Sequence, residues 1–180
     1  MIANFLNILT LSRIFCALLI FLFLYLGQNY WVAFLFFIIA SISDFFDGYL
    51  ARKTNSESVL GEILDPIADK LLIVFVLIGL SINLDSFLIG FISAVIISRE
   101  IWVAALRDIN ARSNQSHKTK VTFLAKTKTT MQMFCISLYL LGLSMNNMMI
   151  IFFADISIII AMLITIQTGL QYTISTFKNG

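Results

Sequence analysis

Uncharged apolar segments of similar length recur along the chain, and they constrain its fold more than any other feature. Six can be drawn, at roughly 6–27, 30–51, 64–83, 86–108, 125–144 and 149–172. Each is close to the ~20 residues that a helix needs to cross the hydrocarbon core of a bilayer. Only 12% of the residues are charged, about half the share in a soluble domain. The sequence therefore predicts an all-α integral membrane protein, with six transmembrane helices in a single domain over residues 1–180.

Basic residues lie on one side of this predicted topology. The short connectors near 28–29, 84–85 and 145–148 contain no Lys or Arg. The two longer connectors, near 52–63 and 109–124, contain Arg52, Lys53, Arg112, Lys118 and Lys120. Because cytoplasmic loops carry the excess of Lys and Arg, both chain termini are predicted to be cytoplasmic.

Polar residues within the spans gather at one depth. They lie in the predicted cytoplasmic half of helix after helix, as Asn7 and Thr10, Asp44 and Asp47, Asp65 and Asp69, Arg99 and Glu100, and Lys126 and Lys128. A charged side chain facing lipid costs roughly 2.5–3.5 kcal/mol at mid-membrane on insertion scales. We therefore expect these groups to converge on a wet interior cavity.

Four carboxylates dominate that depth. Asp44 and Asp47 are three residues apart, and Asp65 and Asp69 are four apart, so each pair lies on one face of its helix. A short inner connector makes the two helices antiparallel, which brings the pairs together. Unpaired carboxylates in a low-dielectric site repel one another, whereas Mg²⁺ or Mn²⁺ prefers such oxygen ligands. No His lies nearby, which disfavours a zinc site.

Residues around the carboxylates suit a diphosphate substrate. Gly48 and Gly61 would let a nucleotide approach the backbone, because they have no side chain. Arg52 and Ser58 can neutralise and hydrogen-bond phosphate. A plainer interpretation of single positions is that Gly48 packs helices, Gly61 forms a turn and Arg52 anchors the topology.

The complete pattern, D-x2-D-G-x2-A-R-x8-G-x3-D-x3-D from Asp44 to Asp69, resembles the signature of the CDP-alcohol phosphatidyltransferases. The resemblance implies six transmembrane helices, a homodimer, and transfer of a group from a CDP-linked donor to a hydroxyl with release of CMP. It implies two divalent ions, Mg²⁺ or Mn²⁺, one held by Asp44, Asp47 and Asp65 and the other by Asp44, Asp65 and Asp69. Asp69 is further implied as the general base. The implied CDP-lipid contacts are Asn7, Thr10, Gly48, Ala51, Arg52, Ser58 and Gly61.

Sequence outside the signature is similar to the bacterial phosphatidylglycerophosphate synthases, which implies a multi-pass inner-membrane protein with a cytoplasmic active site. Its substrates would be CDP-diacylglycerol and sn-glycerol 3-phosphate. The matching segments include Asn4–Arg13, Arg99–Ile101 and Lys126–Met133. Two positions depart from that subgroup, with Leu6 in place of Pro and Ala125 in place of Gly.

The positions of the basic residues give a separate argument for a phosphorylated acceptor. The residues Arg99, Arg107, Lys126 and Lys128 would place several cations beside the metal site, which suits a phosphorylated alcohol. Each could instead be a topology anchor. Two alternatives stay open: the same chemistry with phosphatidylglycerol, inositol phosphate or serine as acceptor, or a non-enzymatic protein that moves cations past its carboxylates.

Overall fold

Six helices account for the regular structure of the residues described by the computed structural model, which are 2–54, 59–113 and 123–178. They are α1 (Ile2–Leu26), α2 (Tyr30–Thr54), α3 (Val59–Asn83), α4 (Phe87–Arg112), α5 (Phe123–Ser144) and α6 (Met148–Phe177). The predicted all-α, six-helix class is confirmed. Most helices run a few residues beyond the predicted apolar windows, because a helix continues past the last apolar residue into a polar end.

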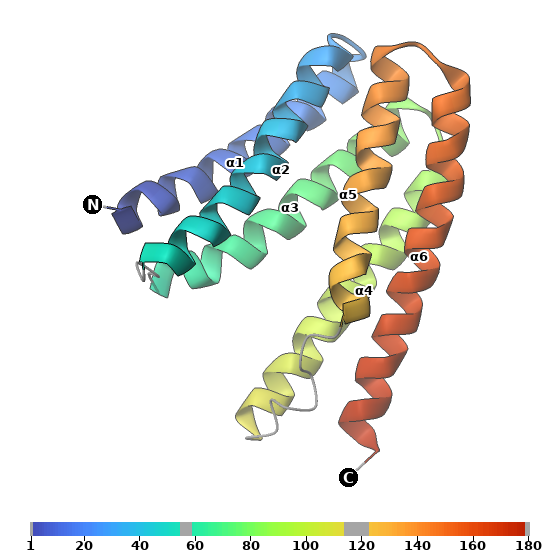
Figure 1. Ribbon diagram of the computed structural model, residues 1–180. Coiled ribbons are helices and arrows are strands. Elements are labelled where there is room, and N and C mark those ends of the chain that lie inside the picture. The colour runs from blue at the N-terminus through green and yellow to red at the C-terminus, as the bar shows by residue number, and fades with distance from the viewer. Residues whose placement is uncertain (1, 55–58, 114–122, 179–180) are drawn as a thin grey trace.

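Three tight turns join the helices at one end of the bundle (Figure 1). Each turn contains at least one residue with positive φ. These are Gly27 and Asn29 in the first turn, Asp85 in the second and Asn146 in the third. Gly, Asn and Asp tolerate this left-handed conformation best. The side chain of Asn147 then caps α6 by accepting hydrogen bonds from the backbone N–H groups of its first turn. These turns allow antiparallel neighbours to follow one another with almost no connecting chain.

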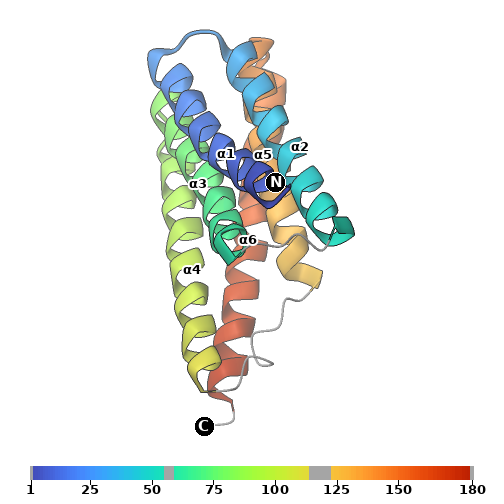
Figure 2. The same cartoon turned by 90° about the vertical axis from the view of Figure 1, so that its left-hand side faces the viewer.

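The helices form two groups of three. In the first group α1 packs on α2 and α3, and in the second α6 packs on α4 and α5. The groups are joined by contacts of α2 with α5, and of α3 with both α4 and α5. Figures 1 and 2 show the groups close together near the turns and spread apart toward the opposite end. The main apolar core follows this shape, since its members lie in the turn-side half, as with Leu24, Leu80, Ile92, Tyr139 and Ile158.

Among the side chains that the structure describes, a second and smaller cluster of buried apolar residues lies toward the spread end, formed by Val103, Leu106 and Tyr172. Charged side chains of α3, α4 and α5 line a cavity between these helices. This division of the bundle positions the candidate site.

The outer surface of the bundle is apolar. Large side chains such as Phe15, Leu22, Phe87, Phe91 and Phe152 are more than 45% exposed, which a bilayer accommodates and water does not. Within the described residues, three helices are long and apolar enough to cross a membrane, Asn7–Leu26 of α1, Phe87–Arg112 and Met148–Phe177. Tyr30–Ser43 of α2 is a shorter apolar stretch. These features fit a multi-pass membrane protein; the crossing of all six helices and the orientation of the termini stay predictions.

Candidate functional site

Two donors on α1 hold two carboxylates of α3. The hydroxyl of Thr10 donates a hydrogen bond to Oδ1 of Asp65 over 2.7 Å. The Nη1 of Arg13 donates to Oδ1 of Asp69, also over 2.7 Å. The Arg13 side chain is fully buried, whereas the Asp69 side chain is 32% exposed. Helix α1 thus orients the carboxylates while Asp69 keeps an exposed face.

The other half of the acidic motif lies on the adjoining part of α2. Asp44, Asp47, Gly48, Ala51 and Arg52 fall within this helix, but their side chains lie outside the described residues, as does all of Ser58. Along the helix axes, Asp47 is ~10 Å from the end of α2 at Thr54, and Asp65 is ~9 Å from the start of α3 at Val59. Because only four residues join these ends, the two aspartates have similar depths.

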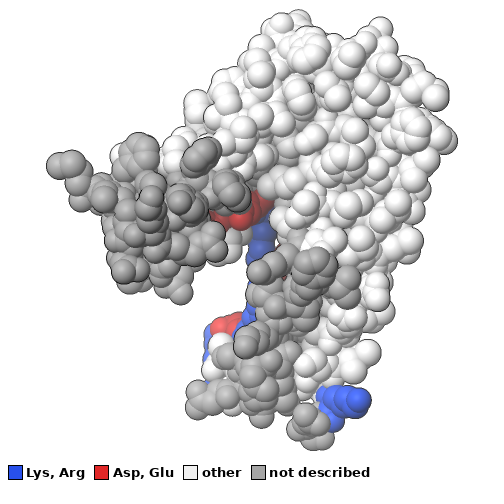
Figure 3. Space-filling view, in the orientation of Figure 1, with Lys and Arg blue, Asp and Glu red and all other residues white. Residues whose placement is uncertain are grey.

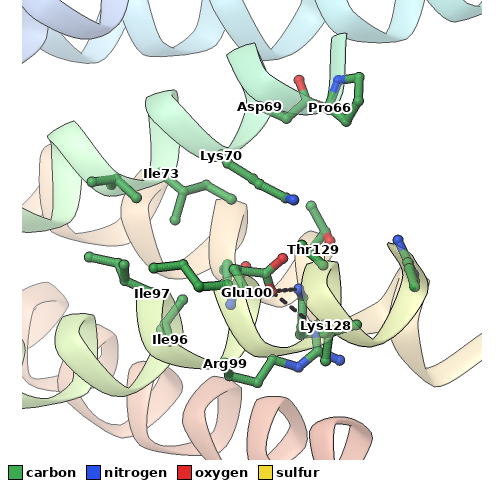
Figure 4. A pocket seen from close by; sticks show the side chains of 16 residues that line it. Pro66, Asp69, Lys70, Ile73, Ile96, Ile97, Arg99, Glu100, Lys128 and Thr129 are labelled. Carbon is green, nitrogen blue, oxygen red and sulfur yellow. Dashed lines mark hydrogen bonds and ion pairs between the residues drawn. The ribbon is translucent and has the colours of Figure 1, made fainter. Parts of the chain in front are cut away.

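A cavity of about 820 Å³ opens beside Asp69, between α3, α4 and α5. Figure 3 shows the hollow in the surface, with acidic side chains above basic ones. Its charged lining residues are Asp69 and Lys70 from α3, Arg99, Glu100 and Arg107 from α4, and Lys128 from α5. In Figure 4 the side chain of Lys70 extends from α3 toward the wall formed by Glu100 and Lys128. The cavity therefore joins the acidic motif to a basic wall.

Glu100 holds two of the basic side chains in place. It accepts a hydrogen bond from Nη1 of Arg99 over 3.0 Å and forms an ion pair with Nζ of Lys128. All three residues line the cavity (Figure 4). Glu100 thus pairs with one arginine and one lysine. Because two cations share one carboxylate, the wall keeps an excess of positive charge.

Helix α6 supports Arg99 from behind. The Nε of Arg99 donates to the backbone oxygen of Thr165 over 3.2 Å, and Nη2 donates to the Thr168 hydroxyl over 2.8 Å. A Cβ on Gly169 would lie 3.0 Å from Cγ of Arg99, so the absence of a side chain there admits the arginine. Gln132 of α5 also reaches α6, through the Thr165 hydroxyl.

A profile of the CDP-alcohol phosphatidyltransferase domain matches residues 3–167, a stretch that contains both halves of the acidic motif and the arginines of α4. The chain belongs to the CDP-alcohol phosphatidyltransferase family. Enzymes of this family are generally metal dependent. The oxygen ligands that the signature supplies are those that Mg²⁺ and Mn²⁺ prefer.

Relatives of this phosphatidyltransferase share one name, CDP-diacylglycerol–glycerol-3-phosphate 3-phosphatidyltransferase. The protein from Rickettsia bellii is 40% identical over 172 residues, which cover 94% of this chain and 93% of the relative. The Rickettsia felis protein is 38% identical over 174 residues, with the same coverage of 94% and 93%. The Haemophilus influenzae protein is 39% identical over 140 residues, covering 77% and 73% of the two chains.

The metal ligands of this phosphatidyltransferase stay a proposal. Among the side chains that the structure describes, which do not include those of Asp44 and Asp47, no group of three or more metal-ligating residues is present. Asp65 and Asp69 nevertheless fit the role, because a carboxylate can accept a hydrogen bond on one oxygen and bind a cation with the other. Gly61 lies one helical turn before Asp65 on α3.

Several residues of the site were not predicted from the sequence. Neither Arg13 nor Lys70 was predicted as a site residue, yet Arg13 pairs with Asp69 and Lys70 lines the cavity. No site residue was predicted on α6, although Thr165 and Thr168 bind Arg99 there. The spacing of Thr10 and Arg13, three residues apart in an apolar helix, was the available signal for a shared polar face.

Replacing Arg13 with Met should destabilise the protein by about 2–3 kcal/mol. Loss of one partner of a fully buried ion pair costs about 3–5 kcal/mol, and the partial exposure of Asp69 lowers that figure. The measurement is thermal unfolding in detergent. Arg112→Met is the matched control, because its pair with Asp108 is exposed on both sides and should contribute less than about 1 kcal/mol. Equal melting temperatures for the two variants would contradict a structural role for the Arg13 pair.

Proposed function

We propose that this protein transfers the phosphatidyl group of CDP-diacylglycerol to sn-glycerol 3-phosphate, which yields phosphatidylglycerophosphate and CMP and serves phospholipid biosynthesis. Family membership supports the reaction type, and the shared name of the relatives supports the acceptor. The observation that carries the proposal is that one and the same cavity is lined by Asp69 of the acidic motif and by four basic side chains.

The basic wall suits the acceptor. A phosphomonoester presents several oxygens, and guanidinium groups bind such oxygens through paired N–H donors. Arg107 is exposed to the cavity, whereas Arg99 is 9% exposed and is held by Glu100 and α6. We assign acceptor phosphate binding to Arg99, Arg107, Lys126 and Lys128, with Lys70 added from its place in the lining.

The acidic motif suits the donor. Asp44, Asp47, Asp65 and Asp69 would hold two divalent ions, Mg²⁺ or Mn²⁺, which when bound neutralise the diphosphate and the departing CMP. We assign CDP-lipid contacts to Asn7, Thr10, Gly48, Ala51, Arg52, Ser58 and Gly61. The Thr10 hydroxyl also donates a hydrogen bond to Asp65 and so helps to orient that carboxylate.

The chain's own residues then bring the reactants together. The acceptor hydroxyl oxygen forms a bond to the phosphorus that bears diacylglycerol, and the bond from that phosphorus to the CMP oxygen breaks. Asp69 accepts the hydroxyl proton as general base. Its Oδ1 is held by Arg13, which fixes the direction of the carboxylate. Positioning and charge stabilisation supply most of the rate in phosphoryl transfer.

The cellular setting follows from the same proposal. We place the site at the cytoplasmic side of the bacterial inner membrane. There it can take up water-soluble glycerol phosphate from the cytoplasm and release CMP into it. We also propose a homodimer, on family resemblance alone.

The function is tested by CMP release from CDP-diacylglycerol in detergent, with Mg²⁺ or Mn²⁺ and a panel of acceptors. We expect turnover with glycerol 3-phosphate and its loss on chelation of the metal. Turnover only with phosphatidylglycerol, inositol phosphate or serine would keep the acidic site and overturn the acceptor. Absence of CMP release with every acceptor would overturn the enzymatic function and favour a cation-translocating protein.

Asp69→Asn should abolish turnover, with a loss of at least about 10³-fold, because the amide cannot take up the hydroxyl proton. Binding of CDP-diacylglycerol, measured by equilibrium titration, should remain within a few-fold of the unmodified protein. Loss of donor binding together with turnover would contradict the role of Asp69 as general base and leave it as a metal ligand only.

Arg107→Ala should raise the KM for glycerol 3-phosphate at least tenfold, because a charge-assisted contact to phosphate is lost. The KM for CDP-diacylglycerol should stay unchanged. Arg112→Ala is the matched control on the same helix, since Arg112 is exposed and pairs with Asp108. An unchanged KM for glycerol 3-phosphate in Arg107→Ala would place the acceptor elsewhere.

A further inference from the structure

One aromatic ring contacts two arginines of α4. The guanidinium carbon of Arg99 is 5.7 Å from the ring centroid of Tyr172, and that of Arg107 is 5.4 Å from the same centroid. Both distances fall within the ~6 Å of a cation–π contact. The two guanidinium carbons are therefore no more than about 11 Å apart, and both contact the same ring.

The ring itself is fixed. Tyr172 is 4% exposed and packs with Val103 and Leu106 in the second apolar cluster. An aromatic side chain held in this way has little rotamer freedom left to lose when a ligand binds. Tyr172 lies beyond the stretch matched by the family profile, which ends at residue 167.

The two arginines depend on the ring to different degrees. Arg99 has further partners in Glu100, Thr165 and Thr168. Arg107 is exposed and donates a long hydrogen bond of 3.5 Å to the Tyr172 hydroxyl. An exposed arginine samples many rotamers, and ordering one on ligand binding costs affinity. A ring contact that orders it beforehand reduces that cost.

We propose that Tyr172 is a positioning residue for acceptor recognition, which orders Arg107 beside the anchored Arg99 so that the two guanidinium groups bind one phosphomonoester. This inference rests on the proposed function and deepens it, because it names what sets the preference for a phosphorylated acceptor. The ring supplies the contact to both cations, and the hydroxyl accepts the long hydrogen bond from Arg107.

The alternative is that Tyr172 only packs α6 against α4. Both roles predict that removal of the ring harms the protein, so the readout has to separate them. A packing role lowers the amount of folded enzyme and thus the maximal rate, and leaves each KM unchanged. A positioning role raises the KM for the phosphorylated acceptor and leaves the KM for CDP-diacylglycerol unchanged.

The test uses the full-length protein in detergent and compares Tyr172→Leu with Tyr172→Phe. Tyr172→Leu should raise the KM for glycerol 3-phosphate about tenfold, a size between those expected for an exposed and for a fully desolvated cation–π contact. Tyr172→Phe keeps the ring and should stay within about threefold. The concentration of inorganic phosphate that halves the rate should shift in parallel with the KM in both variants.

Thr173→Val is the matched control. Its hydroxyl accepts a hydrogen bond from Nε1 of Trp102 over 2.9 Å, so it joins the same two helices without contact to either arginine. Both KM values should remain unchanged in this variant. If Tyr172→Leu does not fold, as judged by thermal unfolding, Tyr172→Met carries the same expectation, because its longer and more flexible side chain fills irregular gaps better.

Several results would overturn the proposal. An unchanged KM for glycerol 3-phosphate in Tyr172→Leu or Tyr172→Met would leave Tyr172 with a packing role, and so would an equal rise for both substrates. If the unmodified protein turns over only with an acceptor that carries no phosphomonoester, the proposed function fails in its acceptor and this inference fails with it. If another phosphorylated alcohol is the acceptor, the proposed function fails in its acceptor, and the same KM comparison with that alcohol then tests the inference separately.

Discussion

The ion pair between Arg13 and Asp69 links the two helices on which the acidic half of the site depends. A fully buried guanidinium on an apolar helix needs a carboxylate partner, because an uncompensated charge in this environment is far less stable than a paired one. Thr10, about one turn earlier on α1, donates a hydrogen bond from its hydroxyl to Asp65. Together the two contacts fix the register of α1 along α3, and this register directs both carboxylates.

The contacts between helices differ in kind along the helix axes. Near the turns, apolar side chains pack the two groups of helices together. Away from the turns, the described side chains also connect the helices through hydrogen bonds and ion pairs, with Glu100 between Arg99 and Lys128, and Thr165 and Thr168 bound to Arg99. Asn110 and Thr176 extend the same α4–α6 contact further with a hydrogen bond of 2.9 Å. These contacts connect α4 with α5 and α6 beside the cavity.

Much of this arrangement could be predicted from the sequence, because hydrophobic length and the spacing of acidic residues are local properties. The six helices and their order were predicted, as was the helical placement of Asp65 and Asp69. The partners of buried polar groups could not be predicted in the same way. Arg13 looks like any cytoplasmic anchor, and Tyr172 looks like any aromatic residue of a membrane helix, until the packing of α1 on α3 and of α6 on α4 places each beside a charge.

The lining of the cavity has a consequence for selectivity. Lys70, Arg99, Arg107 and Lys128 face Asp69 and Glu100, so the cavity carries a formal charge of +2 when all six groups are ionised. A phosphomonoester carries about −1.5 to −2 at neutral pH. Its entry would make the described lining close to electroneutral, whereas a zwitterion such as serine would leave the surplus positive charge uncompensated. The protein would thus discriminate between acceptors by charge balance, before any hydroxyl group is recognised.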